Sequence, residues 1–249
     1  MKFRWTPILC YHRVSPRDKS NPDSPSLGVT PVQFEGQLRL LKTLGYRSVS
    51  IHDLIAYLKA QKNIPPKSVV FTFDDGYKDN YVHAFPLLKK YGFTATVFLV
   101  TDRIGGTNTW DSGTAPLLNE AEIEEMQMAG ITFGSHTATH IDMSKTGKDE
   151  IAEELLSSRK KLESLTSRLD VPFCYPYSRI NEGVKRQVRE AGYLCGIAVN
   201  SGPADDQSLD FYEMMRVQVF SSTSLPGFWK KLQPWYPRWL KFQQKLRGK

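Results

Sequence analysis

The chain of 249 residues is poor in cysteine and has no long apolar run. Its three cysteines, Cys10, Cys174 and Cys195, include no CxxC pair. This argues against a disulfide framework or a thiolate zinc site and favours free, buried thiols. No apolar stretch approaches the roughly 20 residues needed to cross a bilayer, and the stretch 7–11 is too short for the core of a secretion signal. We therefore expect a cytoplasmic protein, peripheral at the membrane if any segment binds lipid.

The sequence also lacks a fixed-period repeat, a low-complexity stretch and a recognisable nucleic-acid-binding module. Lys and Arg number 33 against 26 Asp and Glu, which gives a net charge of +7. This charge favours anionic partners without naming one. Because only the charge and a few aromatic residues would support nucleic-acid binding, we expect no nucleic-acid partner. With 40% hydrophobic residues, the chain can close one sizeable core.

Short apolar, β-branched runs alternate with longer stretches of helical spacing. The expected strands are residues 8–12, 68–73, 95–100, 131–135, 172–176 and 196–199, and the expected helices are 32–44, 51–62, 80–91, 121–129, 148–168 and 182–191. Such alternation is typical of parallel strands covered by helices, and it predicts a single α/β barrel. The long polar stretches 15–31 and 105–116 are expected to be loops over strand ends, where barrels place substrate contacts.

Two adjacent carboxylates follow an apolar strand in the sequence TFDDGY, residues 72–77. Asp74 and Asp75 at a buried strand end are costly unless a cation or a pairing group offsets their charge. An ordinary Asp-Gly turn that closes the strand is the alternative. The motif alone therefore assigns no function.

Two histidines four residues apart follow another expected strand in SHTATH, residues 135–140. On a helical turn, His136 and His140 would project the same way and could hold one ion, whereas surface or capping histidines are the alternative. Two histidines and one carboxylate, with positions left to water, are a ligand set of hydrolytic metal sites. The histidine and aspartate motifs, at two strand ends of one sheet, together predict such a site.

TFDDGY followed by SHTATH resembles the first two motifs of the polysaccharide deacetylase family, the NodB-homology or family 4 carbohydrate esterases. The resemblance covers about 8–220 and implies a distorted (β/α) barrel, placed here at 1–222, that removes acetyl groups from N-acetylated saccharides. It implies that Asp74 is the general base. It also implies that the ligands of Zn²⁺, or of another divalent ion such as Co²⁺ or Ni²⁺, are Asp75, His136 and His140.

The sequence CYPYS, which begins at Cys174, resembles part of the family's third motif, an arginine followed two residues later by Pro-Tyr-Gly. Cys174 stands where the arginine that orients the base is expected, and Ser178 replaces the glycine. The remaining Tyr-Pro-Tyr implies the Tyr177 backbone N–H as oxyanion donor; for the side chains of Tyr175 and Tyr177, packing at a strand end is the alternative. Arg216, on a later strand, is our candidate for the missing guanidinium, with a surface salt bridge as the alternative.

The family's acid histidine usually lies in a C-terminal Leu-x-His motif, but no histidine follows His140. The sequence LCYHRV, residues 9–14, instead resembles the LxYHxV opening of the branch that deacetylates poly-N-acetylglucosamine. This resemblance implies that His12 is the proton donor to the leaving amine, while a hydrogen-bonded core histidine is the alternative. His52 and His83, on expected helices, are interpreted as surface residues.

A basic, aromatic segment, 223–249, follows the expected barrel. It contains Trp229, Trp235 and Trp239 among seven Lys and Arg residues. Mixed aromatic and basic residues suit a membrane interface, which makes a membrane surface a candidate partner. The alternative is a C-terminal barrel helix that packs its tryptophans on the core and keeps a cationic face in solvent.

An active deacetylase has one rival from another class, a carbohydrate-binding protein on a decayed catalytic barrel. The altered third motif favours the binding protein. The full set of two aspartates and two histidines, together with His12, favours catalysis, and we adopt the enzyme as the leading hypothesis.

Overall fold

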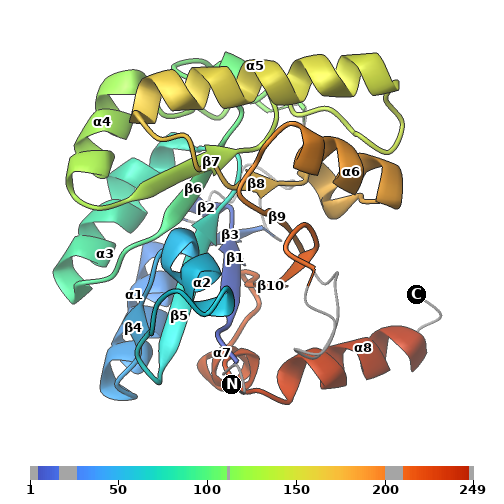
Figure 1. Cartoon of the computed structure of the whole chain (residues 1–249). Coiled ribbons are helices and arrows are strands. Elements are labelled where there is room, and N and C mark those ends of the chain that lie inside the picture. Colours follow the sequence, from blue (N-terminus) through green and yellow to red (C-terminus); the bar gives the residue numbers. More distant parts are fainter. Residues whose placement is uncertain (1–4, 17–26, 111–112, 200–209, 247–249) are drawn as a thin grey trace.

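The structure, a computed structural model, describes residues 5–16, 27–110, 113–199 and 210–246. In this part of the chain, seven parallel strands close into a barrel (Figure 1). They are β1 (Ile8–Tyr11), β5 (Ser68–Phe73), β6 (Thr96–Leu99), β7 (Thr132–Ser135), β8 (Phe173–Cys174), β9 (Gly196–Val199) and β10 (Met214–Gln218). The order is β1-β10-β9-β8-β7-β6-β5, and pairing of β5 with β1 completes the circle. The predicted distorted (β/α) barrel is confirmed.

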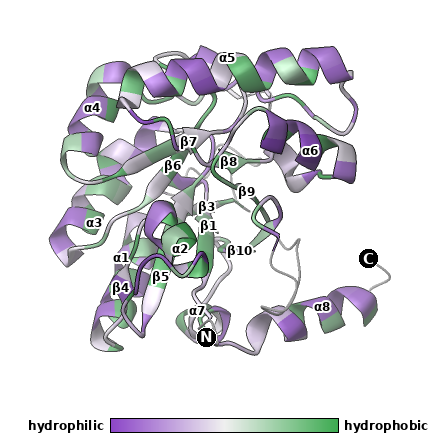
Figure 2. Cartoon of the chain, in the orientation of Figure 1, coloured by the Kyte–Doolittle hydropathy of each residue, from purple (hydrophilic) through white to green (hydrophobic). Residues whose placement is uncertain are grey.

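The strands are largely apolar because both of their faces are covered. All six residues of β5 are buried, since one face meets the barrel interior and the other meets helices. Hydrophobic residues accordingly mark β9 and β10, whereas the outer helix α6 (Glu182–Glu190) is mostly hydrophilic (Figure 2). One aromatic cluster fills the space between α1, β1 and β5, and it comprises Tyr11, Phe34, Phe71, Phe73 and Phe93.

Helices surround the barrel, and capping residues mark several of their ends. The others are α1 (Pro31–Thr43), α2 (Ile51–Leu58), α3 (Phe85–Tyr91), α4 (Glu120–Met128), α5 (Lys148–Thr166), α7 (Leu225–Lys231) and α8 (Tyr236–Leu246). Thr30 and Asn119 begin α1 and α4 with capping boxes. Glycines with φ between 69° and 88° follow α1, α3, α4 and α6, where the left-handed conformation ends a helix.

Several element bounds differ from the predicted ones. The expected helix 51–62 ends at Leu58, and the expected helix 80–91 starts as a π-helical turn, η1 (Asn80–Ala84), before α3. The strands β2 (Arg13–Val14), β3 (Gly28–Val29) and β4 (Arg47–Ser48) were not predicted. Two residues are too few to show the alternation on which strand prediction depends.

The C-terminal helices leave the barrel beside α1. In α7, Phe228 is fully buried, and Gln33 of α1 donates a hydrogen bond to the carbonyl of Ser221 at 2.8 Å. From there α8 extends away from the barrel at the lower right of Figure 1. Across the described ranges, no helix is long and apolar enough to cross a membrane.

Candidate functional site

The predicted site residues meet at the carboxyl ends of the barrel strands. His12 follows β1, Asp74 follows β5, His136 follows β7, and Arg216 lies on β10. Parallel strands bring these ends to one face of the barrel, which is where barrel enzymes place their chemistry. A cavity of about 320 Å³ opens there, lined by His12, Leu27, Asp74, Asp75, Trp110, His136, His140, Tyr175, Tyr177, Ser178, Val199 and Gln218.

Asp75, His136 and His140 form a compact, buried donor set. The Asp75 Oδ1 atom lies 3.4 Å from His136 Nε2 and 3.3 Å from His140 Nε2. Ligand atoms about 2.1 Å from a tetrahedral ion lie roughly 3.4 Å from one another. Oδ1 is also buried without a hydrogen-bond partner among the described residues. The spacing and the chemistry of these three side chains therefore fit a divalent metal.

The other ring nitrogen of each histidine is engaged away from Asp75. His136 Nδ1 lies 2.8 Å from the Cys174 carbonyl, so it carries the proton, and His140 Nδ1 lies 3.2 Å from the Tyr177 hydroxyl. Such outer contacts fix the ring orientation and leave Nε2 to a metal. Burial also lowers the pKa of His136 to about 4, so the ring is neutral, as a ligand must be.

Backbone geometry aims two of these side chains. Asp75 and His140 both adopt left-handed conformations, with φ of 73° and 69°, which few non-glycine residues adopt and which cluster at active sites and ligand clamps. Gly76 also has a φ of 69°, and a Cβ at this position would lie 2.7 Å from Leu99 Cδ2. The Asp-Asp-Gly sequence thus needs its glycine for both conformation and space.

A glutamate on α5 holds the loop that carries the two histidines. Glu154 accepts hydrogen bonds from the backbone N–H groups of Ala138 and Thr139 at 2.8 and 2.9 Å, and from the Thr139 hydroxyl at 2.6 Å. Thr137 adds a side-chain contact to the N–H of His140 at 2.9 Å. The loop is therefore anchored to a helix of the barrel.

Asp74 is paired with Arg216 rather than with the donor set. Arg216 donates from Nη1 to Oδ1 at 2.6 Å and from Nη2 to Oδ2 at 2.7 Å, a two-pronged contact between two buried side chains. Burial alone would raise the pKa of Asp74, but the guanidinium holds it well below its usual range. Arg216 thus makes a buried pair, not the surface salt bridge that was the alternative.

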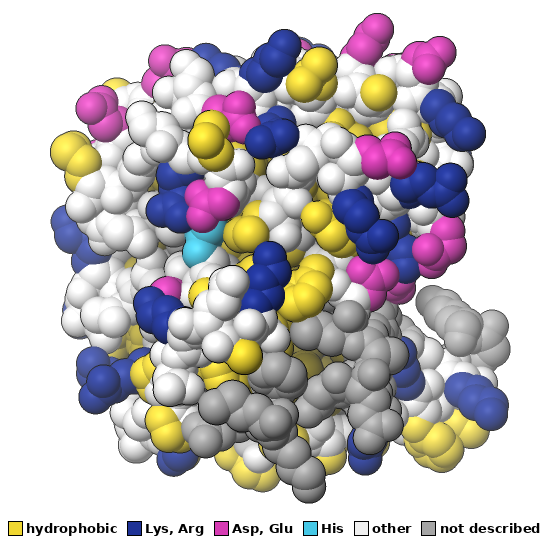
Figure 3. All heavy atoms as spheres, in the orientation of Figure 1, with side chains coloured by type: hydrophobic (Ala, Val, Ile, Leu, Met, Phe, Trp, Pro, Cys, Tyr) yellow, Lys and Arg dark blue, Asp and Glu magenta, His cyan; other side chains and the backbone are white. Residues whose placement is uncertain are grey.

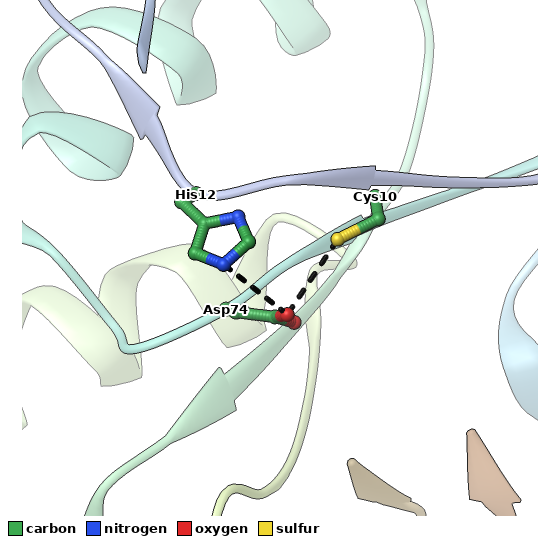
Figure 4. A group of neighbouring side chains, drawn as sticks. All are labelled: Cys10, His12 and Asp74. Atoms are coloured by element: carbon green, nitrogen blue, oxygen red, sulfur yellow. Dashed lines mark hydrogen bonds and ion pairs between the residues drawn. The ribbon is translucent and has the colours of Figure 1, made fainter. Parts of the chain in front are cut away.

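Two thiols flank this ion pair. Cys174 Sγ lies 3.6 Å from Asp74 Oδ1 and 3.0 Å from Arg216 Nη2, and Cys10 Sγ lies 3.5 Å from Asp74 Oδ2 (Figure 4). Burial raises the pKa of both thiols well above the ordinary value. The groups Cys10–His12–Asp74 and Asp74–His136–Cys174 also have metal-ligand spacing, but they suit an ion less well because Arg216 occupies both Asp74 oxygens.

His12 faces Asp74 from the end of β1 (Figure 4). Its Nε2 lies 3.8 Å from Asp74 Oδ2, and its Nδ1 lies 3.4 Å from Gln218 Nε2. The ring lines the cavity, which distinguishes it from a histidine enclosed in the core. The two histidines interpreted as surface residues, His52 and His83, are both partly buried, and His52 Nε2 lies 2.8 Å from the Asp170 carbonyl.

The altered third motif forms a strained turn at the cavity. Tyr177 and Ser178 have φ of 56° and 52°, and the Ser178 hydroxyl accepts a hydrogen bond from the Val199 N–H at 2.8 Å. Tyr175 is buried and donates to the Tyr212 carbonyl at 2.8 Å, which is the packing role given as its alternative. The Tyr177 ring instead contacts His140, with centroids 4.7 Å apart.

Sequence reasoning missed three residues around the site. The Trp110 ring stacks on His140 with centroids 4.4 Å apart and an interplanar angle of 20°; its loop was predicted, but its partner was not. Glu154 and Gln218 gave no signal, because only the fold brings them to the loop and to His12. Of the other predicted loop, 15–31, residues 17–26 lie outside the described residues, and Leu27 lines the cavity.

Comparison with known proteins assigns the family. The model of the polysaccharide deacetylase family matches residues 61–196. The chain belongs to this family. YxkH of Bacillus subtilis is 31% identical over 223 residues, which are 89% of this chain and 74% of that protein. The poly-β-1,6-N-acetyl-D-glucosamine N-deacetylase of Staphylococcus aureus is 27% identical over 222 residues, 82% of this chain and 75% of the relative.

Solved structures of deacetylases share the fold. The Streptococcus pyogenes deacetylase PplD, in complex with acetate, superposes with a TM-score of 0.82 at 26% identity and covers 94% of this chain and 100% of its own. IcaB from Ammonifex degensii superposes with a TM-score of 0.77 at 25% identity, over 93% and 98% of the two chains. As a polysaccharide deacetylase by family, the chain is placed among hydrolases.

Proposed function

We propose that this chain is a metal-dependent hydrolase that removes the N-acetyl group of an amino sugar in a polysaccharide, oligosaccharide or lipid-linked saccharide. One observation carries the proposal: in one open cavity, the Asp75 carboxylate lies 3.4 and 3.3 Å from the Nε2 atoms of His136 and His140, beside the separate, arginine-bound Asp74. The similarity to a poly-β-1,6-N-acetyl-D-glucosamine N-deacetylase supports an amino-sugar polymer as the substrate class.

Asp75, His136 and His140 would hold the metal, Zn²⁺ or another divalent ion such as Co²⁺ or Ni²⁺. When bound there, the ion supplies Lewis-acid polarisation of the amide carbonyl and lowers the pKa of the attacking water. The unpartnered Asp75 Oδ1 and the outward engagement of both Nδ1 atoms support this ligand set.

Asp74 would act as the general base and accept the proton of the attacking water. Its low pKa keeps it ionised, and a carboxylate of low basicity suffices when the water is itself made more acidic. Arg216 would orient the carboxylate, because a two-pronged guanidinium contact fixes both oxygens. An arginine from β10 would thus do the work of the one that Cys174 replaces on β8.

The remaining steps fall to Tyr177 and His12. The backbone N–H of Tyr177 would donate to the oxyanion as the carbonyl carbon becomes tetrahedral. His12, which follows β1 and lies 3.8 Å from Asp74 Oδ2 through its Nε2, would give a proton to the departing nitrogen. Acetate and a free amine are then the products, and the proton from water balances the one given by His12.

We also propose a membrane surface as a partner of this chain. Support comes from the segment 223–249, whose three tryptophans are each more than two-fifths exposed in the structure. Phe228 and Tyr236 are the buried aromatic residues of the described part of this segment, and the greater exposure of the tryptophans supports the membrane surface over the alternative of packing on the core.

The rival function is carbohydrate binding on a decayed barrel. The altered third motif favours it, but Arg216, which contacts both Asp74 oxygens, would supply the guanidinium that this motif lacks, and this supports catalysis. The test is acetate release from chito-oligosaccharides, poly-N-acetylglucosamine, peptidoglycan fragments and lipid-linked amino sugars, after chelation and after metal is restored. We expect release from at least one substrate, lost on chelation and recovered with metal. Binding of metal and saccharide without any release would establish the rival.

Two single substitutions separate the roles of the adjacent aspartates. Asp74→Asn is expected to keep the metal and lose at least about a hundredfold in kcat, because the base is gone while the ligands remain. Asp75→Ala is expected to weaken metal binding, measured by calorimetry. Retained turnover in Asp74→Asn would remove this residue from the role of base.

A further inference from the structure

An exposed apolar stripe runs along α8. Trp235, Trp239, Phe242 and Leu246 are 45%, 44%, 59% and 67% exposed. Separations of four, three and four residues place their side chains on one face of a helix. Trp235 directly precedes α8, and its carbonyl accepts a hydrogen bond from the Trp239 N–H at 3.1 Å, so it continues the helical phase.

The rest of the molecule covers another face of the same helix. Tyr236 is buried, and Leu240 packs against the core. The Tyr236 hydroxyl also accepts a hydrogen bond from Lys231 of α7 at 2.9 Å. Because α8 is attached through these residues, its stripe faces away from the barrel. Hydrophobic side chains on the underside of this projecting helix, with Lys or Arg beside them, are visible at the lower right of Figure 3.

Cations border the stripe, and carboxylates are absent from the sequence around it. The segment 225–249 contains seven Lys and Arg and no Asp or Glu. Arg238 and Lys245 are exposed, and a separation of seven residues puts them on the same flank of α8. A helix with one apolar face and a cationic flank has the pattern of helices that lie in a membrane interface.

The charge pattern selects among possible occupants of the stripe. A second copy of this chain would bring the same cations to the contact, and like charges repel. The phosphates of a nucleic acid would pair with the cations, but Phe242 and Leu246 would remain exposed to water. An anionic lipid surface satisfies both, since tryptophan favours the headgroup region and anionic headgroups attract Lys and Arg.

We propose that α8 docks this protein on an anionic lipid surface. The 11 residues of α8 extend roughly 16 Å, too short to cross a bilayer, so the helix lies parallel to the surface with Trp235, Trp239, Phe242 and Leu246 inserted. This inference deepens the proposed membrane partner and does not depend on the proposed deacetylation.

Partitioning of the full chain onto phosphatidylcholine vesicles, with and without phosphatidylglycerol, tests the proposal. The parent protein should bind the anionic vesicles at low salt, detach at high salt, and show blue-shifted tryptophan fluorescence when bound. Trp239→Ser/Phe242→Ser should bind at least about tenfold more weakly, because the inserted apolar surface is lost. Arg238→Gln/Lys245→Gln should bind the anionic vesicles about 30-fold more weakly.

Matched variants elsewhere on the surface control for general effects. Met128→Ser/Leu169→Ser removes two apolar side chains that are 77% and 73% exposed, and it should bind vesicles like the parent. Lys160→Gln/Arg186→Gln removes the same two types of cation from exposed positions and should cost far less binding than the α8 cation pair. Equal losses of vesicle binding in the control and α8 variants would show that net charge or nonspecific hydrophobic adsorption causes the binding, and would overturn the proposal.

Other outcomes overturn it as directly. Unchanged vesicle binding by Trp239→Ser/Phe242→Ser would show that α8 does not insert. Binding of a DNA or RNA oligonucleotide that needs only the cations, or self-association of the parent that the stripe variant abolishes, would assign the surface to nucleic acid or to a second copy. Acetate release from a soluble oligosaccharide, measured in the same variants, should be unchanged. A parent that binds vesicles without releasing acetate would contradict only the proposed hydrolysis.

Discussion

The buried contact between Arg216 and Asp74 joins β10 to the end of β5, two strands that β1 separates in the barrel. Cys174, on β8, is a small side chain that leaves room beside the carboxylate, and Arg216 enters this space from β10, two strands further round the barrel. Sequence comparison within one motif would read Cys174 as a loss. The contact is visible only when the strands are placed side by side.

Arg216→Lys should keep the charge and lose the two-pronged contact. We expect kcat/KM to fall about tenfold to a hundredfold, because one ammonium cannot fix both carboxylate oxygens. Since Arg216 lowers the pKa of Asp74, weakening the contact should raise that pKa and move the acid limb of the pH profile to higher pH. Lys185→Arg, at a cation outside the cavity, is the control. An unshifted acid limb would show that Arg216 does not set the ionisation of the base.

The phenol of Tyr177 should affect the affinity for the metal, whereas its backbone N–H should affect the rate of the reaction. Tyr177→Phe removes the contact with His140 Nδ1 and keeps the backbone N–H. We expect metal affinity to fall about tenfold to a hundredfold, with kcat at saturating metal nearly unchanged. Tyr175→Phe removes a hydroxyl that binds the Tyr212 carbonyl instead, so its metal affinity should match the parent. Equal affinities in both variants would contradict this role of the phenol.

At the scale of elements, the hydrophobic periodicity of the sequence predicted the longer strands and helices. The runs 68–73 and 196–199 match β5 and β9 residue for residue, because a strand buried on both faces is continuously apolar. The helix 148–168 was predicted two residues too long, since Ser167 adopts a φ of 55° and ends α5 at Thr166.

The site was predictable where each motif follows a strand, because the barrel brings the carboxyl ends of its strands together. Trp110, Glu154 and Gln218 were not, because their contacts depend on how the elements pack.

The link between α5 and the histidine loop gives an element-scale prediction. Glu154→Ala leaves two backbone N–H groups and one hydroxyl without their acceptor, which should lower the free energy of unfolding by about 1–3 kcal/mol. The loosened loop should also bind metal about tenfold more weakly. The neighbouring Glu153 is exposed on the same helix, and Glu153→Ala should change neither quantity. Chemical denaturation and metal titration check both, and parental values for Glu154→Ala would contradict the anchor.

At the scale of the whole molecule, the buried His136 couples stability to pH. Burial lowers its pKa from 6.5 to about 4, so between these values the unfolded chain binds a proton that the folded chain does not. The free energy of unfolding of the metal-free protein should therefore decrease as pH falls from 6.5 to 4, with a contribution on the order of 3 kcal/mol. Urea denaturation across this range should show a shallower dependence in His136→Asn. An identical slope in parent and variant would contradict the assignment.

The central claim is that one divalent ion at Asp75, His136 and His140 makes this barrel a deacetylase. The most direct measurement is a titration of the metal-stripped chain with Zn²⁺ while acetate release from an N-acetylglucosamine oligomer is followed. We predict no release at the start, a rise that levels off at a single ion per chain, and no response from Asp75→Ala over the same range. Release that is already complete in the stripped protein, or equal activation of Asp75→Ala, would contradict the account.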